Sequence, residues 1–223
     1  MTMKSQSTHT AAPKSGTAEN MEARIIEAAK QEFIEKGFEQ TSMSDIAAVV
    51  GINRPTLHYY FRTKDKMFQA VFASIVSHFL PHIDAIFSKQ EPFEKKLGEV
   101  IDIYFGIFSA NPLLPKFIIG EIHRDVNHLI DTFYSLNFDQ YLRHIGELLQ
   151  QEIDKKHFKK VPLQFVFMTF YSQLVFPFLS RNLSKKLFFH DNPEEYARFL
   201  PQWKQHIIAQ ILLLLNPREG LPL

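Results

Sequence analysis

The chain lacks several features that would place it in common functional classes. It has no cysteine among 223 residues, which excludes disulfides, thiol catalysis and zinc sites built on cysteine. It has only 8 glycines and no alternating run of β-branched residues, so strands are not predicted. No run of about eighteen apolar residues occurs and the N-terminal stretch has no apolar segment, so neither a membrane span nor a secretory signal is expected. These absences favour a cytoplasmic protein.

The chain also lacks a strong charge of either sign. Its net charge is +1 and its isoelectric point about 8.0, so any basic surface that binds nucleic acid must be local. What the chain does contain is apolar residues, 45% of the total, which is enough for a sizeable core. Because these residues recur at helical spacing along nearly the whole chain, we predict an all-α fold.

Residues 42–64, SMSDIAAVVGINRPTLHYYFRTK, predict two short helices joined by a tight turn. Ser42 and Asp45 have the spacing of a capping box, which marks the start of the first helix. Gly51 tolerates the positive φ of a turn, and Asn53 is a good N-cap for the second helix. This pattern indicates a helix-turn-helix, in which the second helix can enter the major groove of DNA.

From about Arg24 to Phe68, a fifth of the chain, the sequence resembles the DNA-binding domain of the TetR (tetracycline-repressor) family of bacterial transcriptional regulators. The matching elements are F-x-x-x-G-F, T-S-M-x-x-I-A and G-I-x-R-P-T-L-H-x-Y-F-x-x-K. One departure is His58, because the family most often has tyrosine there. The chemistry of the residues and the resemblance together predict these DNA contacts: Thr41, Ser42, Ser44, Asn53, Arg54, Pro55, Thr56, His58, Tyr59, Tyr60 and Lys64. Among them, Arg54 can pair with guanine and Lys64 is expected at a phosphate.

Apolar periodicity and breaker residues predict about nine helices and three segments. The segments are a disordered arm at 1–19, a helix-turn-helix domain at 20–66, and a ligand-binding and dimerisation domain at 67–223. Beyond residues 20–36 and the motif, the helices are expected from about 64 to a break at Pro81, and then at 92–109, 113–126, 129–152, 162–181 and 193–215. Loops are expected at 154–160 and 182–192.

The part of the chain after residue 60 is rich in phenylalanine, of which the whole chain has 22. Most of these rings will form a core, but such a bundle can also enclose an apolar cavity with a few polar groups. In the TetR family a pocket among helices four to eight binds a small molecule, which implies a bulky, mostly apolar ligand here. The candidate ligand-binding residues are Asp102, Tyr104, Phe105, Phe108, Phe117, Glu121, Tyr141, His144, Phe170, Tyr171, Gln173 and Leu174. Any one of the polar residues is more often a surface residue or a satisfied core group, but as a set they support a pocket.

The last two predicted helices each carry an apolar stripe that suggests burial against a partner. The stripes are Phe167, Phe170, Tyr171, Leu174 and Phe178 on one helix, and Trp203, Ile207, Ile211, Leu214 and Leu215 on the other. In the family these two helices pair with their mates in a homodimer. A two-fold axis then places two reading heads on a palindromic site, with half-sites ~34 Å apart.

The strings that resemble catalytic or metal-binding motifs lack the spacing that those functions need. The HRDVN string at 123–127 has its Asn at the wrong offset for a kinase, and Glu121, His123 and His128 lack metal-ligand spacing. We therefore predict no enzyme, no cofactor and no metal. The expected function is a DNA-binding regulator, most simply a repressor released from its operator by the ligand. The alternatives are an activator or corepressor-dependent regulator of the same fold, or a helical small-molecule-binding protein without DNA binding.

Overall fold

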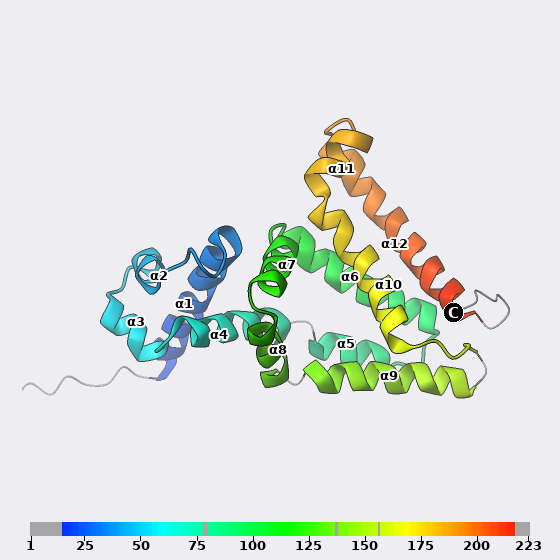
Figure 1. Ribbon diagram of the computed structural model, residues 1–223, viewed down its shortest axis with the longest axis horizontal. Coiled ribbons are helices and arrows are strands. Elements are labelled where there is room, and N and C mark those ends of the chain that lie inside the picture. Colours follow the sequence, from blue (N-terminus) through cyan, green and yellow to red (C-terminus); the bar gives the residue numbers. More distant parts are fainter. Residues whose placement is uncertain (1–14, 78–79, 137, 156, 217–223) are drawn as a thin grey trace, which may run out of the picture. The chain divides into compact units, whose positions relative to one another are not determined.

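The computed structural model describes residues 15–77, 80–136, 138–155 and 157–216 (Figure 1). Within these ranges every regular element is a helix, as the sequence predicts, and there are twelve of them. They are α1 (Ser15–Lys36), α2 (Met43–Val50), α3 (Arg54–Tyr60), α4 (Lys64–Ser77), α5 (Leu80–Phe87), α6 (Phe93–Ala110), α7 (Leu114–Arg124), α8 (Val126–Ser135), α9 (Phe138–Asp154), α10 (Leu163–Leu179), α11 (Arg181–Phe188) and α12 (Pro193–Leu215).

The chain forms two compact units, and the division between them falls at Val71 and Phe72, inside α4. The first unit contains α1, α2, α3 and the first half of α4. Its core is a group of three aromatic rings, Phe33, Phe38 and Phe68, whose centroids lie 5.4 to 5.8 Å apart. These rings join α1, the loop after it and α4, the elements that precede and follow the short helices α2 and α3 in the chain.

The second unit is a bundle in which α6 packs against both α10 and α12. Figure 1 shows α10 and α12 running side by side, with α11 joining their far ends, and α5 lying along α9. Ile101, Leu174 and Ile207, one from each of α6, α10 and α12, are fully buried where these helices meet. On the other side of the unit, Phe72 packs edge-on against Phe133 of α8 at 5.4 Å.

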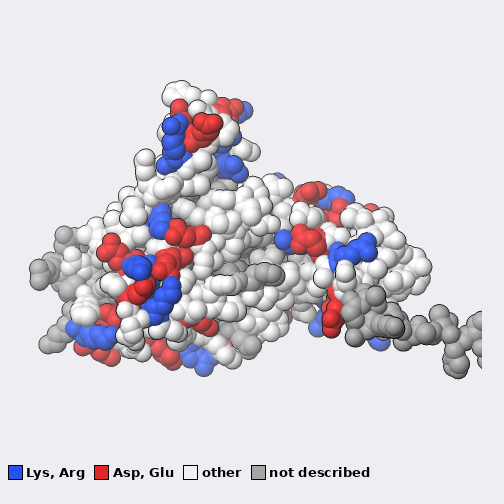
Figure 2. Space-filling model, turned by 180° about the vertical axis from the view of Figure 1, so that it is seen from behind, with Lys and Arg blue, Asp and Glu red and all other residues white. Residues whose placement is uncertain are grey.

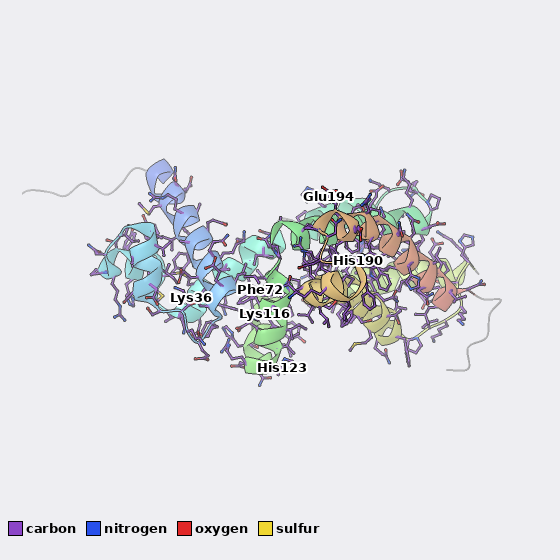
Figure 3. All side chains as sticks on the ribbon, turned by 90° about the horizontal axis from the view of Figure 1, so that it is seen from above. Lys36, Phe72, Lys116, His123, His190 and Glu194 are labelled. Atoms are coloured by element: carbon purple, nitrogen blue, oxygen red, sulfur yellow. The ribbon has the colours of Figure 1, made fainter. Side chains whose placement is uncertain are left out.

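A tight reversal connects α11 to α12. His190 and Asp191 adopt positive φ angles of 51° and 58°, a conformation that non-glycine residues seldom take. Asn192 then caps α12, because its side-chain oxygen accepts from the backbone N–H groups of Glu194 and Glu195. Figure 3 labels His190 in this reversal and Glu194 in the first turn of α12.

The described residues contain three more helices than the nine predicted, and the differences arise at three places. The helix expected at 129–152 is two helices, and α8 starts early because Asp125 accepts from the N–H of His128 and caps it. Most of the expected loop at 182–192 is α11. Pro81 lies in the first turn of α5, where its missing N–H costs nothing, so the break at Pro81 also begins a new helix.

The first helix also begins earlier than predicted. α1 starts at Ser15, so residues 15–19 of the expected disordered arm are helical, and the remainder of that arm lies outside the described residues. Of the helices in the described ranges, none alone is long and apolar enough to cross a membrane. Two sharply bent pairs, α6 with α7 and α10 with α11, reach that length and composition only when taken together.

Candidate functional site

The turn between α2 and α3 is fixed by the local chemistry that the sequence predicts. The N–H of Asp45 donates to Ser42 Oγ at 3.1 Å, and the N–H of Ser42 donates to the Asp45 carboxylate at 3.0 Å, which completes the capping box. The Ser42 hydroxyl also donates to this carboxylate at 2.7 Å, and the hydrogen bonds from the hydroxyl and the N–H of Ser42 hold the pKa of Asp45 below its usual range. Gly51 ends α2 with φ of 78°, and Asn53 caps α3 by accepting from the N–H of Thr56 at 2.8 Å.

Helix α3 buries one side and presents the other to solvent. Leu57 is fully buried in the first unit, whereas Arg54 and His58 are exposed and Tyr59 keeps 78% of its surface accessible. The ring of Tyr59 lies edge-on against Tyr60 at 5.3 Å. An exposed guanidinium at the start of a helix, followed by an exposed phenol, can reach base edges and phosphates when that helix enters a major groove.

Two of the predicted DNA contacts have side chains that are used inside the protein. Thr41 is 1% exposed, and its hydroxyl lies 3.1 and 2.9 Å from the carbonyl oxygens of Glu32 and Gly37. The ammonium of Lys64 donates to the carbonyl oxygens of Phe38 and Thr41 at 2.9 and 3.1 Å. It also lies 4.3 Å from the centre of the Phe38 ring. Both side chains tie α1 and its loop to the helices that follow, and their contacts to DNA stay a prediction.

The remaining predicted contacts are accessible or half-buried. Ser42, Ser44, Asn53 and Pro55 are exposed, and Thr56 is half-buried with its hydroxyl donating to Asn53 at 2.7 Å. On the face drawn in Figure 2, the coloured Lys and Arg side chains are interspersed with Asp and Glu rather than gathered in one field.

A cavity of about 70 Å³ lies in the second unit between α5, α6, α9, α10 and α12. Its lining runs along α9 from Tyr141 to Leu149 and along α10 from Leu163 to Tyr171. Eight residues of helix rise about 12 Å, so the cavity is a slot rather than a sphere. Apart from the two tyrosines, every side chain that lines the slot is a hydrocarbon.

One end of the slot meets a wider hollow of about 580 Å³. Phe87, Phe93 and Leu148 line both spaces, so the slot and the hollow are neighbours. The hollow is polar, because its lining also includes lysines and glutamates such as Lys96 and Glu152. An apolar slot beside a polar opening can admit a chain-like molecule.

Three tyrosine hydroxyls gather at the other end of the slot. The hydroxyl of Tyr104, from α6, lies 2.7 Å from that of Tyr171, from α10. Tyr141 of α9 lies close enough to influence the pKa of both phenols. Burial raises the pKa of all three phenols above the ordinary value for tyrosine, which is itself well above neutrality, so they are uncharged at neutral pH.

The structure brings only part of the predicted ligand set to this slot. Tyr141, Phe170 and Tyr171 line it, and Tyr104 contacts it through Tyr171. Eight predicted residues do not line it: Asp102, Phe105, Phe108, Phe117, Glu121, His144, Gln173 and Leu174.

The positions of those eight residues have individual causes. Asp102 is exposed and pairs with Lys204 at 2.6 Å. Phe105 and Phe108 both pack on Phe178 in the core, with ring centroids 5.2 and 5.3 Å away. Phe117 and Leu174 are buried, and His144 is half-buried. The backbone carbonyl of Gln173 accepts from the indole N–H of Trp203, and the Glu121 carboxylate pairs with Arg124.

Sequence reasoning missed most of the lining because it is aliphatic. Leu142, Ile145 and Leu148 extend the α9 stripe that begins at Tyr141. Their spacing of three residues indicates that they share one side of α9, and that side faces the slot.

The residues weighed as a metal site are engaged elsewhere. Nδ1 of His123, labelled in Figure 3, lies 2.8 Å from the Ile119 carbonyl oxygen, and the Glu121 carboxylate accepts from Arg124 at 2.8 Å. Within the described residues no group of three or more acidic or histidine side chains is placed to hold a metal ion.

Comparison with known proteins places this geometry in context. Residues 25–71 match the family model described as bacterial regulatory proteins, tetR family. The chain is 26% identical over 141 residues to the uncharacterized HTH-type transcriptional regulator YfiR of Bacillus subtilis. The aligned region covers 63% of this chain and 69% of that relative. It is 34% identical over 58 residues to the HTH-type transcriptional regulator TtgR of Pseudomonas putida, covering 26% of this chain and 28% of that one.

The fold of the second unit has solved counterparts as well. FadR from Bacillus subtilis, in complex with stearoyl-CoA, superposes with a TM-score of 0.69 over 87% of this chain and 99% of that one, at 16% identity. An exposed recognition helix on a capped turn, followed by a helical bundle, defines a helix-turn-helix transcriptional regulator. Residues 25–71 are thus similar to the DNA-binding part of the bacterial regulatory proteins of the tetR family.

Proposed function

We propose that this regulator is a homodimeric repressor that leaves its operator when an apolar molecule occupies the slot of the second unit. The observation that carries the proposal is that one chain combines a solvent-facing α3 with an apolar slot that no side chain fills. Regulators of this family bind DNA operators and ligands and are usually dimers. DNA binding is assigned to the first unit, and ligand binding and dimerisation to the second.

In this proposal Arg54 reads a base and Tyr59 contacts the DNA backbone. Both are exposed on α3, and Arg54 opens the helix, where it points toward base edges in helix-turn-helix complexes. Loss of a guanidinium that pairs with guanine costs about 1 to 3 kcal/mol and relaxes specificity at that base pair. The effector, by contrast, can shift the DNA-binding equilibrium only by as much as it prefers one state over the other.

The test begins with selection of bound sequences from a random double-stranded library. Fluorescence anisotropy on the selected site then compares wild type with Arg54→Ala and with Arg143→Ala, whose guanidinium is exposed in the second unit and pairs with Asp139. The proposal expects a palindromic site, weakened roughly tenfold or more by Arg54→Ala and not by Arg143→Ala. Selection of no sequence, or equal affinities for all three proteins, would overturn it.

The effector is proposed to be a chain-like apolar molecule. The slot is about 70 Å³, less than half of the roughly 150 Å³ cavity that binds benzene, so a chain-like ligand enters it only if the surrounding helices move apart. The stearoyl-CoA bound to Bacillus subtilis FadR is a molecule of that shape. Titration of the protein–DNA complex with long-chain acyl compounds tests the sign of regulation, because release identifies a repressor and tightening identifies a corepressor.

Dimerisation is proposed through the outer faces of α10 and α12. Phe165, Met168, Phe176 and Leu179 of α10 keep 46%, 66%, 62% and 44% of their surface exposed, and their spacing places them on one side of the helix. Such an apolar stripe suits an isologous interface. Light scattering should give a dimer for wild type and a monomer for Met168→Glu, with loss of operator binding. A dimeric Met168→Glu would place the interface elsewhere.

A further inference from the structure

Helix α11 packs on its own protomer with its polar side. The guanidinium of Arg181 lies over the Tyr196 ring, 5.7 Å from its centre, and the hydroxyl of Ser184 lies 3.0 Å from that of Ser180. Lys185 lies one helical turn after Arg181, and only 17% of its side chain is exposed. These contacts fix which side of α11 faces the rest of the second unit.

The apolar side of α11 faces solvent instead. Leu183, Leu187 and Phe188 keep 61%, 63% and 70% of their surface exposed, and the two leucines lie one helical turn apart. The next residue shows the contrast, because the ring of Phe189 packs edge-on against Tyr196 at 5.5 Å. A helix of a globular protein normally turns its apolar side to the core. Within one protomer, α11 therefore has the reverse of the usual orientation, and an exposed apolar surface of this kind marks a binding site for another molecule.

The exposed face of α11 adjoins the exposed stripe of α10. Phe176 and Leu179 of that stripe are followed by Leu183 and Leu187 at intervals of three or four residues. The two helices meet at a bend of 73°, so α11 projects from the end of α10 rather than extending its line (Figure 1). The apolar face of α11 thus begins where the α10 stripe, through which dimerisation is proposed, ends.

The α10 stripe alone is smaller than a stable interface needs, which is about 800 Å² on each partner. A large apolar side chain that is fully exposed offers about 200 Å², so the four half-exposed residues of the α10 stripe supply about 400 Å². The three exposed residues of α11 add about 400 Å² more on the same scale. Together the two helices present the apolar area of a stable dimer interface.

The charges of this surface suit a second copy of the same chain. A two-fold axis brings the same patch of both copies together, so like charges within the patch would repel each other. Helix α10 has no Asp, Glu, Lys or Arg from Leu163 to Leu179. On α11, Arg181 and Lys185 are half-buried against the protomer, which leaves Lys186 as the exposed cation of that helix.

Resting on the proposal that the protein dimerises through α10, we propose that α11 is a second part of the same interface. Its apolar face of Leu183, Leu187 and Phe188 packs against the second copy, while its polar side holds it on its own protomer. Because α11 supplies about half of the apolar area, it governs the stability of the dimer. Operator binding then depends on α11 as well, since a palindromic site needs both reading heads.

The test measures the dimer dissociation constant of the full-length protein by sedimentation over a dilution series. The variants are Leu187→Glu and the matched control Ile130→Glu, since Ile130 is also exposed but lies on α8, which packs on α7 and α9. We expect Leu187→Glu to raise the dissociation constant at least about thirtyfold, as loss of a central apolar contact does, and Ile130→Glu to leave it within about twofold. Equal constants for wild type and Leu187→Glu would overturn the inference.

A second measurement leaves most of the apolar face intact. The chain has no cysteine, so Leu187→Cys and Ile130→Cys each carry a single thiol. Labelling of Leu187→Cys by a maleimide should slow at least about tenfold as the protein passes from mostly monomer to mostly dimer, because the second copy covers the thiol. Labelling of Ile130→Cys should not change. A rate for Leu187→Cys that is the same at every protein concentration would show α11 to lie outside the interface.

A lipid surface is the other partner that an exposed apolar helix with a nearby lysine could meet. Vesicles of phosphatidylcholine test it, because binding that Leu187→Glu abolishes, with an unchanged dimer constant, would assign α11 to the membrane and overturn the inference. The Met168→Glu variant keeps the two proposals apart. If Met168→Glu dissociates the dimer and Leu187→Glu does not, the α10 interface stands and the role of α11 falls. If Met168→Glu stays dimeric, the α10 interface itself falls.

Discussion

Replacing Lys64 with methionine separates two roles for this residue. The ammonium donates to the carbonyl oxygens of Phe38 and Thr41 and lies over the Phe38 ring. A hydrogen bond from a charged group contributes about 1.5 to 3 kcal/mol, and a cation over an aromatic ring about 0.5 to 1 kcal/mol at an exposed site. Since Lys64 is only partly buried, we expect Lys64→Met to destabilise the protein by about 2 kcal/mol.

The assay combines thermal melting with a salt series on the selected DNA site. In a protein of this size about 2 kcal/mol lowers the melting temperature by about 4 to 8 °C. A phosphate contact would instead lower the slope of log affinity against log salt by about 0.9. The matched control is Lys66→Met, because the Lys66 ammonium bonds only to Gln69 of its own helix among the contacts that the described structure gives it. An unchanged melting temperature with a lower slope for Lys64→Met would refute the structural role.

Three further changes test the core and one surface contact. Thr41→Val keeps the shape of a buried side chain but removes its hydroxyl, and should lower the free energy of unfolding in urea by about 1 kcal/mol. Leu174→Ala empties a fully buried position and should cost about 2 to 5 kcal/mol in the same assay. The hydrogen bond with His157 lowers the pKa of Glu152, so that contact stabilises the fold above the ordinary carboxyl pKa and is lost as the pH falls. The melting temperature of His157→Ala should therefore lie below that of wild type near pH ~7 and equal it near pH ~3. The same difference at both pH values would show that the contact with Glu152 does not cause it.

The sequence predicted those parts of the DNA-binding unit that depend on neighbours a few residues away. The capping box of Ser42 and Asp45, the left-handed Gly51 and the Asn53 cap all appear in the structure. Each depends on groups no more than four residues apart, so the spacing of residue types is enough to specify it. The prediction of an all-helical fold was confirmed for the same reason, because helical periodicity is local.

Contacts between distant residues were not predictable from spacing. Lys64 donates to a carbonyl group 26 residues away, a contact within the protein that residue spacing does not indicate. Periodicity found apolar stripes on α10 but could not tell the core from the surface. The predicted stripe residues Leu174 and Phe178 are buried within the protomer, whereas Phe176 and Met168 are exposed.

The slot shows the same limit. Tyr104, Tyr141 and Tyr171 were candidates by residue type, but their convergence depends on how α6, α9 and α10 pack, and Tyr104 and Tyr171 are 67 residues apart in sequence.

The empty slot also determines how the protein should respond to hydrostatic pressure. A void of about 70 Å³ in every molecule amounts to about 40 mL per mole, comparable with the whole volume decrease of about 20 to 100 mL per mole when proteins unfold. Compression therefore favours states in which water enters the slot or the second unit opens. A molecule that fills the slot removes this void, so the bound protein should withstand higher pressure than the free one even where the two melt at similar temperatures.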